Sequence, residues 1–82
     1  MTDLEEAWAE LDAANASLGW TVGRPYYHDE AFVWEQYAYD ATEKPRVGQR
    51  SREWTAVGRT DVDCVREMAR CLREISTGTV PR

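Results

Sequence analysis

The chain has few of the residues that support catalysis, metal binding or membrane insertion. It contains two cysteines, one histidine and one lysine among 82 residues, and no apolar run exceeds a handful of residues. A transmembrane helix needs about 20 mostly apolar residues, so no segment is predicted to cross a membrane. The first six residues include three acids and no base, whereas a secretory signal begins with basic residues and continues with apolar ones. We therefore expect a cytoplasmic protein.

The two cysteines do not form a pattern that binds metal. Cys64 and Cys71 lie seven positions apart in a predicted helix, which places their Cα atoms about 10 Å apart. That separation exceeds the limit of roughly 7 Å for a disulfide, so both are predicted to be reduced and to fill the core. Neither a Cys-x-x-Cys pair nor a Cys/His cluster is present. No metal and no cofactor are expected.

The single histidine is the only candidate for acid–base chemistry. His28 is followed by Asp29 and Glu30, so it is a candidate general base oriented by a carboxylate. The interpretation we favour is a polar hairpin turn. No serine lies in a nucleophile-elbow setting, and no glycine-rich phosphate loop occurs. We expect that the protein is not an enzyme and has no catalytic residues.

What the chain does contain is a dense aromatic segment in its middle. Its aromatic residues, many of them at every second position, are Trp20, Tyr26, Tyr27, Phe32, Trp34, Tyr37, Tyr39 and Trp54. A period of two is typical of strands, and an amphipathic helical pattern lies on each side. The chain, 43% hydrophobic and 30% charged, is therefore predicted to form one α+β domain over residues 1–82. The predicted order of elements is α-β-β-β-α.

The two predicted helices have recognisable ends. They span residues 3–18 and 61–76. Thr2 and Thr60 are each followed three positions later by an acid, a pattern that caps helix N-termini. Gly19 and Gly78 follow the last turns, where glycine tolerates the left-handed conformation that ends a helix.

Three strands are predicted between these helices, over residues 20–27, 31–39 and 51–57. Gly23 and Pro25 weaken the first strand, and proline cannot donate to a β-ladder, so we expect this strand at an edge. Residues 41–50 are polar and basic and are predicted to form a flexible hairpin loop. Residues 77–82 are expected to be a C-terminal tail.

Both helices are predicted to pack on the same face of a three-stranded antiparallel sheet. Alternation along the strands and helical spacing assign the inner layer, which comprises Trp8, Leu11, Leu18, Trp20, Val22, Phe32, Trp34, Trp54, Ala56, Val65, Met68, Ala69, Leu72 and Ile75. The second face of the sheet is left open, as antiparallel sheets allow.

The open face is the predicted functional surface. Tyr37 and Tyr39 are its predicted anchors, because exposed tyrosines are enriched in protein interfaces. The remaining predicted partner-binding residues are Glu35, Glu53, Thr55, Arg66, Arg70 and Arg73, with the charged ones as a rim. The predicted partner is another protein, or a second copy of the chain in a homodimer. A purely structural role for the tyrosines in cross-strand pairs is the alternative.

A nucleic-acid partner is the alternative function. Residues 1–40 carry nine acids and one base, whereas residues 41–82 carry six acids and nine bases. The bases that would follow a nucleic-acid backbone are Lys44, Arg46, Arg50 and Arg52. A solubilising loop explains the same cluster, and a GC-rich genome explains the excess of arginine over lysine.

The C-terminal half resembles the end of double-stranded RNA-binding domains. Residues 54–60 contain a glycine and a threonine and lead into a helix with small and aliphatic residues at the family's spacing. The resemblance covers about residues 3–76 and implies the same order of elements. That family binds phosphates with a lysine cluster at the start of its last helix. Here Asp61, Val62 and Asp63 occupy that place, so only the topology is carried over.

A second resemblance is to small uncharacterised proteins of actinobacteria and their phages. It rests on the frequent arginines and on the C-terminal residues 78–82. If the chain is phage-encoded, this resemblance implies that the partner is a host protein.

Overall fold

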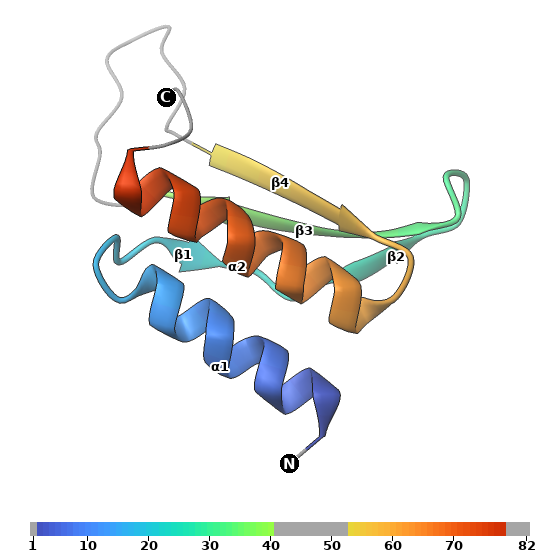
Figure 1. Cartoon of the computed structure of the whole chain (residues 1–82). Coiled ribbons are helices and arrows are strands. Elements are labelled where there is room, and N and C mark those ends of the chain that lie inside the picture. Colours follow the sequence, from blue (N-terminus) through green and yellow to red (C-terminus); the bar gives the residue numbers. More distant parts are fainter. Residues whose placement is uncertain (1, 41–52, 79–82) are drawn as a thin grey trace, which may run out of the picture.

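Two α-helices lie side by side over one face of an antiparallel sheet (Figure 1). The computed structural model of the chain describes residues 2–40 and 53–78. Its elements are α1 (Asp3–Asn15), β1 (Thr21–Val22), β2 (Tyr26–His28), β3 (Val33–Tyr39), β4 (Glu53–Gly58) and α2 (Asp61–Thr77). The α+β class and the predicted placement of both helices on one face are confirmed. The predicted loop at 41–50 lies outside the described residues, as does most of the predicted tail.

The predicted N-caps of both helices and the predicted C-cap of α2 are confirmed, whereas Gly19 does not cap α1, whose C-cap is Ala16. The hydroxyl oxygen of Thr2 accepts a hydrogen bond from the backbone N–H of Glu5 at 3.1 Å, and Thr60 does the same for Asp63 at 3.1 Å. Gly78 adopts the left-handed conformation at the end of α2, with φ of 77°. Each helix therefore begins at its predicted residue.

Helix α1 ends three residues earlier than predicted because of Asn15. Its side-chain Nδ2 donates to the Trp20 carbonyl at 2.8 Å, and its Oδ1 accepts from the Trp20 N–H at 3.0 Å. Gly19, with φ of 66°, allows the chain to turn between them. The asparagine thus holds the first residue of the sheet region against the end of the helix, and Trp20 is buried there.

The predicted first strand is interrupted by a one-residue bulge. Strand β3 forms the centre of the sheet, with β4 on one side and both β1 and β2 on the other. Val22 pairs with Ala38, and Tyr26 pairs with Glu35. Three residues, 23–25, therefore face two residues on β3, which defines a β-bulge. The predicted edge position of this strand is confirmed, and Gly23 and Pro25 lie at the interruption.

The bulge reverses which residues face the helices. In an uninterrupted strand, Tyr26 would lie on the same side as Val22, because side chains alternate. The extra residue instead pairs Tyr26 with Glu35 on the outer side and Tyr27 with Trp34 on the inner side. The carbonyl of Gly23 in the bulge accepts a 2.8 Å hydrogen bond from the Gln36 side chain, which is fully buried.

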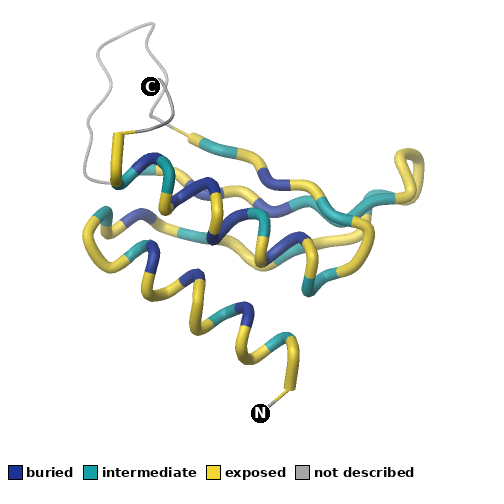
Figure 2. Tube along the Cα trace, in the orientation of Figure 1, coloured by how far each residue is buried: buried dark blue, intermediate teal, exposed yellow. Residues whose placement is uncertain are grey.

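The core fills the space between the helices and the sheet, as the dark segments in Figure 2 show. Its buried apolar members are Ala7, Leu11, Ala14, Trp20, Ala38, Ala56, Val65, Met68, Ala69, Leu72 and Ile75. Half-buried side chains packed against it include Trp8, Leu18, Val22 and Trp54. Most of the predicted inner layer is therefore confirmed. Trp34 is half-buried and makes an edge contact with Tyr27, with ring centroids 5.7 Å apart.

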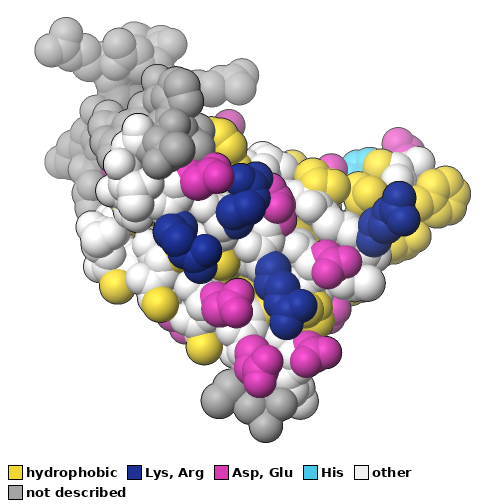
Figure 3. Space-filling view, in the orientation of Figure 1, with side chains coloured by type: hydrophobic (Ala, Val, Ile, Leu, Met, Phe, Trp, Pro, Cys, Tyr) yellow, Lys and Arg dark blue, Asp and Glu magenta, His cyan; other side chains and the backbone are white. Residues whose placement is uncertain are grey.

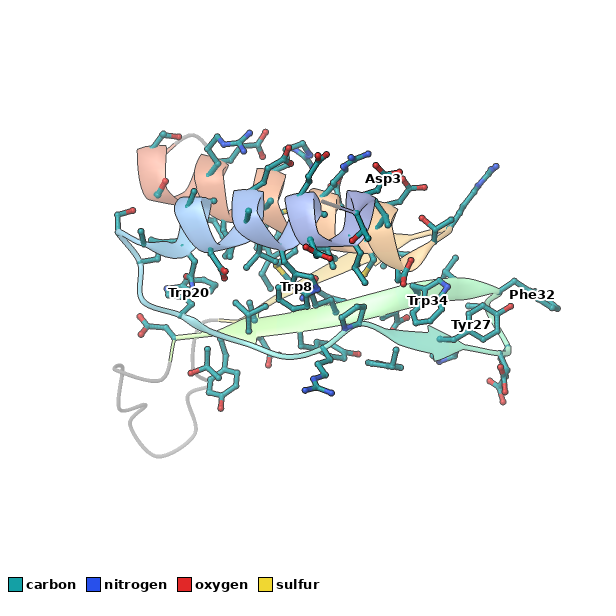
Figure 4. The ribbon with its side chains drawn as sticks, turned by 90° about the horizontal axis from the view of Figure 1, so that it is seen from below. Asp3, Trp8, Trp20, Tyr27, Phe32 and Trp34 are labelled. Atoms are coloured by element: carbon teal, nitrogen blue, oxygen red, sulfur yellow. The ribbon has the colours of Figure 1, made fainter. Side chains whose placement is uncertain are left out.

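The predicted burial of Phe32 is wrong. Its side chain is 76% exposed, and Figure 4 shows it at the far end of the β2–β3 hairpin. Residues 29–32 form a four-residue loop closed by a 2.9 Å hydrogen bond from the Phe32 N–H to the His28 carbonyl. Phe32 has φ of 57°, so it belongs to the turn, and β3 begins only at Val33. The alternation that predicted its burial does not extend into a turn.

Candidate protein-binding surface

One face of the sheet is covered by neither helix (Figure 4). We call it the open face. The strand register assigns to it Thr21, Tyr26, His28, Val33, Glu35, Tyr37, Tyr39, Glu53, Thr55 and Val57. Its large side chains are accessible: Tyr26 is 41% exposed, Tyr37 and Tyr39 are each 45% exposed, and Val57 is 46% exposed. The open face is therefore a flat surface bearing three half-exposed tyrosines.

Two of these tyrosines share one carboxylate. The Tyr26 hydroxyl donates a hydrogen bond to Glu35 Oε2 at 2.9 Å, and the Tyr37 hydroxyl donates to the same oxygen at 3.2 Å. The two phenol rings stack, with centroids 5.9 Å apart and an interplanar angle of 24°. We call Tyr26, Glu35 and Tyr37 the tyrosine–glutamate cluster. It holds the carboxylate in one orientation on the open face.

The cluster favours the protonated form of the Tyr26 phenol. Hydrogen bonding with Tyr37 is the main cause that raises the pKa of Tyr26 above the ordinary tyrosine value, followed by desolvation and by the Glu35 carboxylate. A phenol that donates to a carboxylate loses that hydrogen bond when it ionises. Tyr26 therefore remains a hydrogen-bond donor at neutral pH.

The sequence did not identify Tyr26 as a member of this surface. The predicted inner layer included Trp20 and Val22 from the first strand, and Tyr26 was assigned to neither side. The signal that was available is the Gly23–Pro25 interruption, because glycine and proline within a strand favour bulges. A bulge there shifts the alternation by one residue and places Tyr26 beside Glu35.

The predicted anchors do lie together on the open face. Tyr37 pairs with Thr55, and Tyr39 pairs with Glu53, across β3 and β4. Glu35 is on the same side, two residues before Tyr37. Their common placement is established, and their role in binding remains a prediction.

The predicted arginine rim is wrong in its placement. Arg66, Arg70 and Arg73 are exposed on α2, and basic side chains gather over that helix on the face shown in Figure 3. Because α2 packs on the inner side of the sheet, its solvent-facing side lies across the molecule from the open face. These three arginines therefore cannot border the tyrosines.

Arg70 also has partners of its own on α2. It forms ion pairs with Glu67, one turn before it, and with Glu74, one turn after it, the latter at 2.7 Å. Hydrogen bonding between Arg70 and Glu67 raises the pKa of the arginine and lowers that of the glutamate. Such exposed pairs contribute little to stability.

The bases of the alternative nucleic-acid site fall outside the described residues. These bases are Lys44, Arg46, Arg50 and Arg52. Nucleic-acid binding through them stays a prediction. His28 lies at the hairpin end of the open face, and its buried Nδ1 has no hydrogen-bond partner within residues 2–40 and 53–78. No carboxylate in that part of the chain orients this histidine.

The described residues contain no other group with an evident chemical role. They include no cluster of three or more histidine, cysteine or acidic side chains that could hold a metal ion. Cys64 and Cys71 are free and buried, and burial raises the pKa of both thiols, that of Cys64 to about 11. None of the helices described is long and apolar enough to cross a bilayer.

Comparisons with protein-family models, with curated proteins and with solved structures find no match to this chain.

Proposed function

We propose that this chain is a small non-enzymatic module that docks on another protein through the open face. The observation that supports the proposal most directly is the set of three half-exposed tyrosines on a sheet face that neither helix covers. Tyrosine has a large rigid ring with a polar end, so it gains contact area at a low entropic cost and is enriched among interface hot spots.

Tyr39 distinguishes this proposal from a purely structural role. Tyr26 and Tyr37 stack on each other and share a carboxylate, so the fold itself accounts for part of their presence. Tyr39 pairs with Thr21 and Glu53, and its ring stacks on no other ring among the described residues. A ring that is 45% exposed and has no stacking partner contributes little to the core. An external partner would bury it.

Capture from a lysate of the native host tests the proposal. The immobilised chain is compared with the double variant Tyr37→Ser, Tyr39→Ser. The matched control is the double variant Arg66→Ser, Arg73→Ser, which changes two exposed side chains on the opposite side. We expect the tyrosine variant to lose a bound protein that the wild type and the arginine variant retain. Hydrogen exchange on the isolated complex should then show protection in β3 and β4. Equal capture by all three chains, or protection confined to α2, would contradict the proposal.

A second copy of the chain is a possible occupant of the same face. Light scattering after size-exclusion chromatography distinguishes this case. A dimer that the Tyr37→Ser, Tyr39→Ser variant converts to a monomer would identify the partner as the chain itself. A strict monomer at high concentration would exclude self-association.

A further inference from the structure

Among the described residues, the Glu35 carboxylate has no basic partner on its own face. Its cross-strand neighbours are Tyr26 on β2 and Val57 on β4. No outward position of the four strands carries lysine or arginine. Arg24, exposed in the bulge, makes no ion pair with any residue in the described ranges. Residue Glu35 is half-buried, and its carboxylate lies beside the phenols of Tyr26 and Tyr37.

Within residues 2–40 and 53–78, hydrogen bonds reach one oxygen of this carboxylate. Both phenols donate to Oε2, at 2.9 and 3.2 Å. Oε1 accepts no hydrogen bond from the described residues. The two hydrogen bonds fix the plane of the carboxylate, so the free oxygen has a defined direction before any partner arrives. Such preorganisation lowers the entropic cost of binding.

The surroundings of the carboxylate favour a planar cation. A guanidinium group donates to carboxylates in a fixed geometry and stacks on aromatic faces, whereas an ammonium is a compact and strongly hydrated point charge. Accessible phenol rings lie beside the carboxylate, with Tyr26 41% and Tyr37 45% exposed. We propose that the tyrosine–glutamate cluster is the recognition site for an arginine side chain of the protein partner.

This inference rests on the proposed function and specifies its chemistry. Arginine is, with tyrosine and tryptophan, among the residues most enriched at interface hot spots. The bases on α2 face away from the open face, so they do not repel an incoming arginine there. Arg24 is the competing cation, since it lies in the bulge between β1 and β2, two residues before Tyr26.

The test uses a defined probe rather than the unidentified partner. The pentapeptide acetyl-Gly-Arg-Gly-Arg-Gly-amide is titrated into the isotope-labelled chain, and amide and tyrosine-ring signals are followed by NMR. The matched probe replaces both arginines with citrulline, which keeps the shape of the side chain and removes its charge. We expect the arginine peptide to bind roughly five- to tenfold more tightly, with shifts concentrated at Tyr26, Glu35 and Tyr37. A lysine peptide should bind less tightly than the arginine peptide.

Variants connect the binding to the carboxylate. Glu35→Gln keeps the size of the side chain, and it should reduce arginine-peptide affinity to that of the citrulline peptide. Glu10→Gln, an exposed acid on α1, is the control for net charge and should change nothing. Circular dichroism checks that both variants are folded. Equal affinity for arginine and citrulline peptides, unchanged affinity in Glu35→Gln, or shifts centred on α1 would each overturn the inference.

The two proposals fail in different ways. If the tyrosine double variant loses a captured protein but arginine peptides do not bind, the docking face stands and the arginine assignment is overturned. If arginine peptides bind at the cluster but lysate capture does not depend on the tyrosines, the site chemistry stands and the proposed protein-docking function fails.

Discussion

Gly58, the last residue of β4, is predicted to be the least tolerant of a side chain among the four glycines that the structure describes. A Cβ atom at this position would lie 2.4 Å from the backbone nitrogen of Cys64 and 2.8 Å from its Cα atom. Ordinary contacts of a Cβ begin near 3.4 Å, so the shortfall is 3.4 − 2.4, or about 1 Å. The obstruction is the backbone of the first turn of α2, which cannot move aside as a flexible side chain would. Gly58→Ala therefore requires α2 to shift relative to β4.

The expected cost follows from what holds α2 in place. Its first two turns carry the fully buried Cys64, Val65 and Met68, and Thr60 caps its start. Added methyl groups in packed regions cost about 1–3 kcal/mol, and more when backbone must move. We expect Gly58→Ala to lower the free energy of unfolding by about 3 kcal/mol, out of the roughly 4–12 kcal/mol available to a domain of this size. The corresponding fall in Tm is about 10–25 °C.

Urea and thermal unfolding, followed by circular dichroism and tryptophan fluorescence, measure this cost. Gly23→Ala is the matched control, because a Cβ at Gly23 would lie 3.6 Å from the Tyr37 carbonyl oxygen, an ordinary contact. Its effect should stay below about 1 kcal/mol. Equal losses in the two variants, or a loss below about 1 kcal/mol at Gly58, would refute the argument that strand and helix approach too closely there for any side chain.

Three further predictions test other local features. The Phe32→Gly variant should be about 1 kcal/mol more stable than the Phe32→Ala variant in urea unfolding. Both substitutions remove an exposed ring, but only glycine adopts the left-handed backbone conformation without strain. Equal free energies of unfolding would show that residue 32 is not strained. Asn15→Ala should lower the free energy of unfolding by about 2 kcal/mol, because it removes both hydrogen bonds to Trp20. If the loss is no larger than that caused by an alanine substitution at an exposed position, such as Asp12→Ala, these hydrogen bonds do not stabilise the fold. Burial raises the pKa of Cys64 from 9.0 to about 11, so its contribution to stability is present below pH 9 and is lost as the pH rises to about 11. Unfolding free energies measured across that range should fall more steeply for the wild type than for Cys64→Ala.

The helices and the central strand could be predicted because their signals are local. Thr2 and Thr60 cap the helices through hydrogen bonds that span three residues. Alternation along Val33–Tyr39 needs only its own residues, so Tyr37 and Tyr39 were assigned to the open face without knowledge of their neighbours. Such local patterns predict the structure correctly because the periodicity of a helix or a strand decides which of its side chains face the core.

The errors arise where a tertiary contact overrides a local pattern. Phe32 continues the alternation of β3 in sequence. In the structure it is the last residue of the four-residue loop, and the pairing of β3 with β2 begins at Val33. The arginines of α2 were assigned correctly to its solvent side. A helix packed on one face of the sheet turns that side away from the tyrosines on the other face, so the rim prediction did not follow from the predicted fold. Gln36 occupies an inner position that composition would give to an apolar residue. Its burial depends on the Gly23 carbonyl, a partner 13 residues away.

The bulge connects these observations to the candidate site. It turns the Gly23 carbonyl toward the Gln36 side chain, which permits a polar residue at a fully buried position. It also shifts the alternation of the edge strand by one residue, so that Tyr26 pairs with Glu35. Without that shift, Pro25 would pair with Glu35 and Tyr26 would face the helices, so the carboxylate would lose the donor at 2.9 Å. A local interruption that weakens a strand therefore brings the Tyr26 hydroxyl to the Glu35 carboxylate.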